Sequence, residues 1–233
     1  MRNVKLCLLF LTMLCSAANS SVNAQSNTVG VSLRLGLLNF CDVFSPTIQP
    51  GVQLDIKNRF AVGVDCGIGI LSLLEEDSSN NKYGNHHYYK LKAEGKYFFK
   101  QKEKQNLAKR IFPYISIEHM YFHHTYSPKN QYVEVKKSKK YYYFSSANIE
   151  RNIHVATGKF GFEYYFNKRL FLDTYVGLGV RQYYVALHNP QDLRQSIEPT
   201  YPADYIRLYS RFTIGDFTLA NVMLGIKLGF LLN

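Results

Sequence analysis

After its first residues, the sequence lacks any run of about 18 apolar residues, the length that an α-helix needs to cross a bilayer. It has no tryptophan and only four cysteines. Cys7 and Cys15 lie in the N-terminal segment, and Cys41 and Cys66 alone are too few for a disulfide framework. A helical membrane protein and a disulfide-stapled secreted domain are therefore both excluded.

The N-terminus has the features of a secretory signal peptide. Arg2 and Lys5 make its start positive, an apolar run too short to span a bilayer follows, and small residues up to Ala24 provide a cleavage site. We therefore expect residues 1–24 to direct export and residues 25–233 to form one mature domain.

The mature chain is basic. The formal net charge is +11, and Arg2 and Lys5 supply two of these charges, so +9 remains after cleavage. A basic protein can bind nucleic acid, anionic lipid or acidic polysaccharide. An exported chain rarely meets nucleic acid, and the sequence contains no nucleic-acid-binding motif. Anionic lipid headgroups are therefore the expected partners, and nucleic acid is not.

Apolar and polar residues alternate along most of the mature chain with the period of two that is typical of β-strands. In one segment Val62 and Val64 fall on one face, whereas Gly63 and Asp65 fall on the other. The segments expected to form strands are 29–38, 47–56, 60–71, 87–99, 111–125, 154–166, 170–184 and 219–232.

Short and long connections alternate between these strands. The short ones are residues 57–59, 100–110 and 167–169, and the longer ones are 39–46, 72–86, 126–150 and 188–217. Outer-membrane barrels have short periplasmic turns and longer external loops. The pattern therefore predicts an all-β fold, an antiparallel up-and-down transmembrane β-barrel of about eight strands. The basic run within residues 100–110 would then be periplasmic and serve solubility.

One face of each expected strand is apolar, and the other carries glycine and charge. In a membrane barrel the apolar face contacts lipid and the polar face lines the interior. An unpaired charge in a confined interior is costly, so we expect each acid to have a basic partner and the charged side chains to close the interior. The acids Asp55, Asp65, Glu163 and Asp173 are expected to meet Arg34, Lys159, Arg181 or Lys227. The same faces carry Glu118, Glu94, Lys90, Lys92 and Lys96.

A secreted, soluble lipocalin-like barrel that binds a small apolar ligand is the alternative interpretation of the same strands. Such a barrel would place the apolar faces inside. The charge on the opposite faces disfavours it, as does the absence of the tryptophan that lipocalins usually carry near their start.

The last expected strand combines glycine with alternating apolar residues over 225–230, which resembles the signal that the barrel-assembly machinery recognises. The stretch from Gly158 through the turn 167–169 to Gly179, with the strand pattern of nearly the whole mature chain, resembles small outer-membrane β-barrel proteins of Bacteroidota. These include a family of unknown function and are similar in architecture to OmpA-type and OmpW-type barrels. The resemblance implies an outer-membrane location and contact with outer-membrane lipid, lipopolysaccharide and the barrel-assembly machinery. It brings no catalytic residues.

Residues capable of metal binding or catalysis do not form a recognisable site. The histidine pairs 86–87 and 123–124 lie near the ends of neighbouring strands, but adjacent residues on a strand point to opposite faces, so one of each pair points away. Ser116 and Glu118 share a face that His119 does not. We expect no catalytic residue, metal or cofactor, with an outer-membrane lipid-modifying enzyme as the alternative.

The densest charge run is Lys136, Lys137, Lys139 and Lys140, in an expected external loop. It could bind lipopolysaccharide phosphates or acidic glycans, or could simply be a solvated loop. The sequence therefore predicts a non-enzymatic, monomeric outer-membrane protein with a structural or surface-interaction role in the cell envelope.

Overall fold

The computed structural model describes residues 30–38, 46–56, 59–69, 86–102, 110–196 and 213–232, so the expected signal peptide lies outside the described residues. In these ranges the chain forms eleven strands in one sheet and no α-helix. The strands are β1 (Gly30–Gly36), β2 (Thr47–Ile48), β3 (Pro50–Ile56), β4 (Phe60–Gly69), β5 (His87–Phe98), β6 (Ile111–Tyr126), β7 (Lys129–Val135), β8 (Lys140–Tyr165), β9 (Leu170–Gln191), β10 (Arg194–Ser196) and β11 (Thr213–Leu231). None of the described segments is a helix of the length and apolarity needed to cross a membrane.

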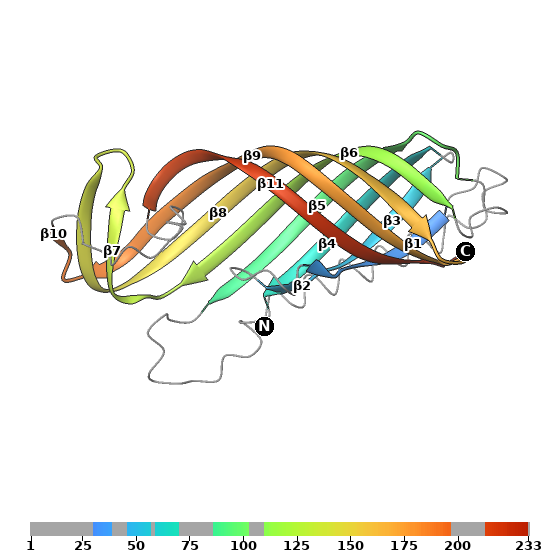
Figure 1. Cartoon of the computed structure of the whole chain (residues 1–233). Coiled ribbons are helices and arrows are strands. Elements are labelled where there is room, and N and C mark those ends of the chain that lie inside the picture. Colours follow the sequence, from blue (N-terminus) through green and yellow to red (C-terminus); the bar gives the residue numbers. More distant parts are fainter. Residues whose placement is uncertain are drawn as a thin grey trace.

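Eight of the strands pair edge to edge in a closed ring, in the order β1, β3, β4, β5, β6, β8, β9 and β11, and β11 pairs back onto β1 (Figure 1). Every pairing in this ring is antiparallel. The short strand β2 pairs with β4, while β7 and β10 pair with the part of β8 that runs beyond the ring. The expected fold class, an all-β antiparallel up-and-down barrel of about eight strands, is confirmed.

The stagger of the strands sets the width of the barrel. From Ser32 on β1, successive cross-strand partners lead around the ring to Asn221 on β11, but the β11 partner of Ser32 is Leu231, ten residues further along. With strands ~4.8 Å apart and a rise of ~3.3 Å per residue, this stagger gives a tilt of about 41° and a backbone radius of about 8 Å. Such an interior has room for side chains and little else.

The surface of the ring is apolar and the middle of its interior is polar, the reverse of a soluble barrel. Ile117 and Val222 point outward and are 76% and 75% exposed, whereas their neighbours Glu118 and Asn221 point inward and are 1% and 5% exposed. The same alternation continues around the ring. The apolar residues outside are well exposed, among them Val62, Leu91, Ile115, Phe160, Phe162, Val176, Leu178, Val180 and Leu224.

Two apolar clusters lie inside the barrel, one toward each end. The turn end is the end with the connections 57–59, 99–110 and 166–169, and the opposite end is the far end. The turn-end cluster is Ala61, Phe98, Phe112, Tyr114, Tyr165, Phe171, Tyr175 and Leu231. The far-end cluster is Tyr88, Met120, Phe122, Val133, Phe144, Ala147, Ile149, Ile153, Val155, Tyr183 and Val185.

Strands at the far end are longer than the sequence pattern predicted. The expected loop 126–150 is largely strand, because β7 and the first part of β8 pair with each other there, and β10 pairs with the other edge of β8. The segment 141–152 lacks regular alternation, so its strand character comes from main-chain pairing on both edges. Part of the expected loop 188–217 is also strand, since β11 begins at Thr213. The expected connections 39–46 and 72–86 lie almost entirely outside the described residues.

Inward glycines on β11 make room for large aromatic rings from β9. A Cβ added to Gly225 would lie 2.0 Å from Cζ of Tyr175, and one added to Gly229 would lie 2.0 Å from Cζ of Phe171. Both rings are buried in the turn-end cluster. These glycines are therefore required by close packing across a narrow interior.

Substituting Gly225 with alanine should lower the free energy of unfolding by about 1–3 kcal/mol, because the buried ring of Tyr175 must shift to admit a methyl group. The matched control is Gly95→Ala on β5, where an added Cβ meets no atom within 4 Å. Urea titration, followed by the mobility difference between folded and unfolded protein on gels, measures both variants. Equal unfolding midpoints for the two variants would contradict the packing argument.

Candidate functional site in the barrel interior

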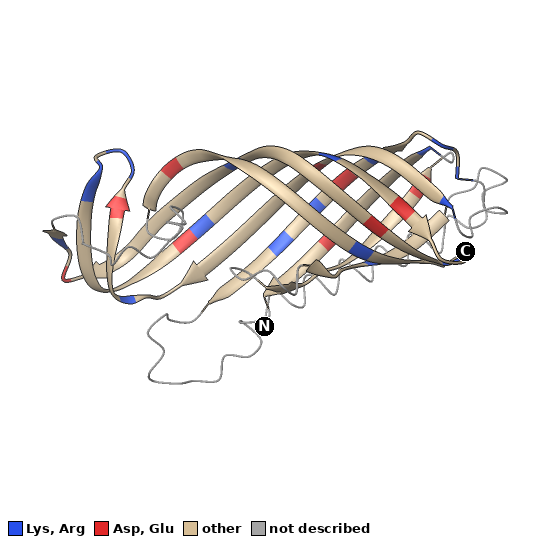
Figure 2. Cartoon of the chain, viewed as in Figure 1, with Lys and Arg blue, Asp and Glu red and all other residues tan. Residues whose placement is uncertain are grey.

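All eight ring strands carry charged residues, whose positions along the ribbon are coloured in Figure 2. Their buried side chains line the interior between the two apolar clusters. Alternation brings them there, because the outward neighbours on each strand are apolar or uncharged over most of the ring. The buried charged residues are Arg34, Asp55, Asp65, Lys90, Lys92, Glu94, Lys96, Lys102, Glu118, Arg151, Lys159, Glu163, Asp173 and Lys227, and Arg181 is half-buried. Eleven of them form two connected groups.

The central group contains three acids and three bases: Asp65, Glu94, Glu118, Arg34, Lys159 and Lys227. Asp65 lies 2.8 Å from Nη2 of Arg34 and 2.9 Å from Nζ of Lys227. Both bases also reach Oε2 of Glu94, at 3.1 and 3.0 Å. Lys159 lies 3.1 Å from Oε1 of Glu94 and also pairs with Glu118.

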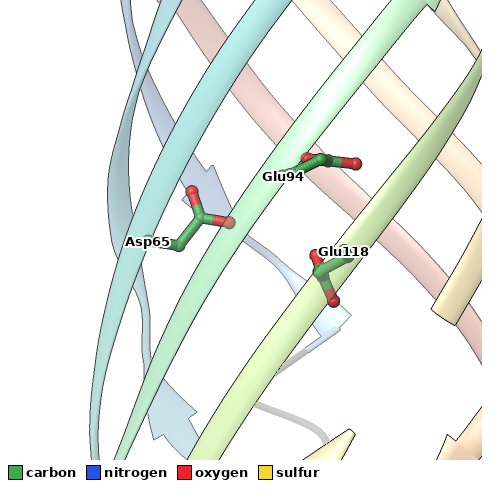
Figure 3. A group of neighbouring side chains, drawn as sticks. All are labelled: Asp65, Glu94 and Glu118. Atoms are coloured by element: carbon green, nitrogen blue, oxygen red, sulfur yellow. The ribbon is translucent and has the colours of Figure 1, made fainter. Parts of the chain in front are cut away.

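The three carboxylates of the central group have the spacing of a metal site. One oxygen from each of Asp65, Glu94 and Glu118 lies within 4.8 Å of the others, and Figure 3 shows the three side chains on neighbouring strands. However, each acid already contacts at least one of the three bases in the group. Because the charges balance and cations contact five of the six carboxylate oxygens, all but Oε1 of Glu118, the group is better described as a set of ion pairs than as a cation site.

The second group, the turn-end group, consists of Asp55, Lys96, Lys102, Glu163 and Asp173. Lys96 lies 2.9 Å from Glu163 and 2.6 Å from Asp173. Lys102 lies 2.6 Å from Glu163 and 3.2 Å from Asp55. Each acid of this group therefore has a cationic partner.

Neutral side chains complete and connect the two groups. The amide of Gln53 accepts a hydrogen bond from Arg34 at 2.9 Å and donates to Asp55 and Glu163, at 2.9 and 3.0 Å. The hydroxyl of Tyr114 donates to Asp173 at 2.6 Å. The ion pairs thus form one hydrogen-bonded layer through the interior.

Lys102 was missed by sequence reasoning, which assigned the basic run 100–110 to a solubilising turn. That assignment is wrong for Lys102, which is 5% exposed and lies over the ring of Phe98, with Nζ 3.7 Å from the ring centre. Alternation gave no clear signal for it, because Lys100, which lies between Phe98 at the end of β5 and Lys102 and has the same even-numbered phase, is exposed.

The expected pairings are met in part. Asp65 pairs with Arg34 and Lys227, but the other expected acids pair with Lys96 and Lys102. The expectation that Arg181 meets a carboxylate is wrong. Its guanidinium donates to the Tyr183 hydroxyl and to Oδ1 of Asn221, at 3.3 and 2.8 Å, because Arg181 lies nearer the far end than the inward acids.

The residues considered for catalysis do not converge. Oγ of Ser116 donates to Glu94 at 3.0 Å, Glu118 pairs with Lys159, and His119 is exposed on the opposite face of β6. These side chains therefore do not form a nucleophile with a neighbouring base.

The histidine pairs 86–87 and 123–124 are divided between the two faces of the sheet. Nδ1 of His86 lies 2.9 Å from Nε2 of His124, whereas His87 and His123 are on the outward phases of β5 and β6. The four imidazoles are therefore not gathered around one point.

The run Lys136, Lys137, Lys139 and Lys140 lies at the turn between β7 and β8, and all four side chains are exposed. Lys139 has a φ of 52°, and its amide donates to the carbonyl of Val135 at 2.8 Å. The amide of Lys136 donates to Ile214 on β11 at 3.0 Å, which anchors the hairpin. The lysines are thus held on an ordered turn.

Comparison with known proteins finds a similar solved structure. It is the N-terminal β-barrel domain of Pseudomonas aeruginosa OprF. The alignment covers 88% of this chain and 97% of the OprF chain, with 13% sequence identity and a TM-score of 0.42. No protein-family model and no curated protein matches the chain.

Replacing Arg34 with methionine should lower the free energy of unfolding by about 3–5 kcal/mol, because it removes a buried cation shared by Asp65 and Glu94. Arg181→Met is the matched control and should have a much smaller effect, since Arg181 contacts only neutral groups through its hydrogen bonds. Urea unfolding of the refolded protein measures both. Adding Asp65→Asn to Arg34→Met should recover part of the lost free energy of unfolding. A similar loss in Arg34→Met and Arg181→Met would contradict the role of Arg34 as a shared buried cation.

Proposed function

We propose that this chain is an outer-membrane β-barrel protein with a non-enzymatic, structural role in the cell envelope. The observation that carries the proposal is the inverted polarity of the ring: exposed Ile, Val, Leu and Phe outside, and buried ion pairs inside. In water such a surface would be a large apolar patch, whereas in a bilayer it is solvated by lipid.

The height of the apolar band supports the proposal. On β6 the outward residues run from Ile111 to Tyr121, which at the strand tilt derived above is about 25 Å along the barrel axis, the height typical of outer-membrane barrels. Aromatic side chains lie on the outward phase near both edges of the band, as in interfacial girdles. They are Phe60, Tyr97, Phe99, Tyr164, Phe166 and Phe230 at the turn end and Tyr89, Tyr121 and Tyr184 at the far end.

The alternatives fit less well. A soluble carrier of an apolar ligand needs an apolar cavity, and the middle of this interior is filled by ion pairs. A lipid-modifying enzyme needs a nucleophile and a base in contact, which Ser116, Glu118 and His119 do not provide.

The proposal also covers how the chain is exported, inserted and oriented in the outer membrane. Residues 1–24 direct export, and residues 25–233 form the barrel domain, inserted by the barrel-assembly machinery as a monomer of the small type found in Bacteroidota. The turn end faces the periplasm and the far end, with the β7–β8 hairpin, faces outward. Outer-membrane lipid and lipopolysaccharide surround the apolar band.

We further propose that the interior is closed to ions. The ion-pair layer spans the barrel between two apolar clusters, and eight strands leave no space beyond that of side chains.

Membrane insertion and closure are tested separately on the full mature chain. Unboiled and boiled samples should differ in gel mobility, and the protein should fractionate with outer membranes; recovery as a soluble monomer would overturn the membrane proposal.

Planar-bilayer recordings should show no steady nanosiemens-scale channel, because the charges are paired across the interior. Such a channel would overturn the closed interior while leaving the membrane location intact.

The lysine turn supports a surface-interaction role. Lys140 precedes His154, near the edge of the apolar band, by 14 residues of β8, which is up to about 45 Å of strand. The turn therefore lies beyond the lipid headgroups, among the saccharide chains of the cell surface. We propose that it contacts anionic sugars there, through exposed charges held by an ordered hairpin.

The double variant Lys136→Gln, Lys137→Gln should weaken binding of the refolded protein to immobilised dextran sulfate by roughly tenfold at low salt, because it removes two exposed charges from the turn. The control is Lys168→Gln, Arg169→Gln, which removes two exposed charges at the turn end. Retention on the column against salt concentration measures both. If the control loses as much binding, the interaction depends on net charge alone and the role of the hairpin is wrong.

A further inference from the structure

All seven histidines of the chain are described, and all lie in one sector of the barrel. They are on β5, β6, β8 and β9 or directly before β5: His86, His87, His119, His123, His124, His154 and His188. This sector is an unbroken part of the ring, since β5 pairs with β6, β6 with β8 and β8 with β9. Proximity of imidazoles from different strands is therefore built into the sheet.

Two of these histidines, His119 on β6 and His154 on β8, face each other on the outside of the barrel. Nδ1 of His154 lies 3.4 Å from Nε2 of His119, and the rings are stacked with centroids 5.5 Å apart. In the β6–β8 register His119 is opposite Ala156 and His154 is opposite Tyr121, so the pair is diagonal. Both side chains are exposed on rigid, neighbouring strands.

Their surroundings make this pair unusual. The outward residues before His119 on β6 are Ile115 and Ile117, and the outward neighbour on β8 is Ala156. A polar side chain at the edge of an apolar band is costly unless its hydrogen-bonding groups are satisfied. The two imidazoles can hydrogen-bond to each other. An apolar residue at each position would nevertheless be more favourable in a surface that faces lipid.

We propose that His119 and His154 bind a divalent transition-metal ion of the zinc and copper class at the outer edge of the apolar band. Imidazole nitrogens bind zinc at about 2.0–2.1 Å, and two ligands of a tetrahedral ion are then about 3.4 Å apart. That is the separation of the two nitrogens. Each imidazole binds in its neutral form, with the proton on the other ring nitrogen, so no proton is released from a neutral pair.

The site has two protein ligands and leaves positions for water or for a group from another molecule. The rings of Tyr121 and Tyr184 lie against His154, at centroid distances of 5.1 and 6.0 Å, and limit its movement. The hydroxyl of Tyr121 donates to Asn152 at 2.7 Å, so it is held away from a ligand role. The preorganised part of the site is therefore the histidine pair.

The other histidine clusters fit a metal less well. His123 and His188 lie 4.0 and 3.4 Å from different oxygens of Glu150. A hydrogen bond from Asn152, at 2.9 Å, and the two histidines hold the pKa of Glu150 below its ordinary value. That carboxylate, which lies beyond the apolar band, is thus already engaged.

The remaining pair is enclosed by aromatic rings. His86 and His124 both stack on Tyr126, with centroids 5.3 and 4.8 Å from it. Their ring planes are therefore fixed by stacking, which leaves His119 and His154 as the most accessible pair.

The test is a calorimetric titration of the full chain, refolded in detergent micelles, with zinc chloride. We expect saturable uptake of one ion per chain, weakened at least tenfold in His119→Gln and in His154→Gln. The matched control is His87→Gln, an exposed outward histidine on β5, which should bind as the unchanged protein does. Heat-dependent gel mobility verifies that each variant is folded.

A second measurement identifies the ligands. Copper(II) bound to the unchanged protein should show two nitrogen ligands in its electron paramagnetic resonance spectrum, and each single variant should lose one. The absence of stoichiometric binding, or a loss in Glu150→Gln or His124→Gln instead, would overturn the proposal. Because the measurement is made in detergent, its outcome is independent of whether the membrane location and the closed interior are upheld.

Discussion

The structure depends on the closure of eight strands with a stagger of ten residues. This closure fixes the tilt, and with it an interior about 8 Å in backbone radius, in which every inward side chain contacts side chains from several strands. Glycine at 225 and 229 is then required by the rings of Tyr175 and Phe171, and the buried acids Asp55, Asp65, Glu94, Glu118, Glu163 and Asp173 each meet a cation from another part of the chain. A slip of one residue in any strand would turn its charges toward the outside.

The ion pairs of the interior are better understood as a requirement of this closure than as a source of stability. Removing two charges from water costs about as much as their attraction returns, whereas leaving one of them unpaired is strongly destabilising. Arg34, shared by Asp65 and Glu94, therefore matters more for neutralising these two buried acids than for any net stability that the ion pairs add. In the proposed membrane setting the apolar outer face has no such requirement, because lipid accepts any apolar side chain.

Alternation in the sequence was sufficient to assign Asp65, Glu163 and Lys227 to the inside and Val62 and Val222 to the outside. It could not predict their partners, because these depend on the stagger: Lys96 reaches Asp173 across the interior, and Arg181 lies beyond the acids. Lys102 was missed because a turn residue carries no alternation of its own. The long ends of β8 and β9 were missed because their paired edges, and not a pattern of faces, make them strands.

The far end is where the chain departs from what a barrel requires. A strand crosses a membrane with about 9–11 residues, yet β8 has 26 and β9 has 22. The turn end is filled by rings packed on glycines, which leaves little freedom there for another role. Toward the far end, by contrast, main-chain pairing holds the lysine turn beyond the ring, and the ring strands β6 and β8 bring two histidines together on the apolar outer face. Neither the lysine turn nor the histidine pair improves the packing or the closure of the barrel. Residues that break the local folding rules without stabilising the fold are the first places to look for a function.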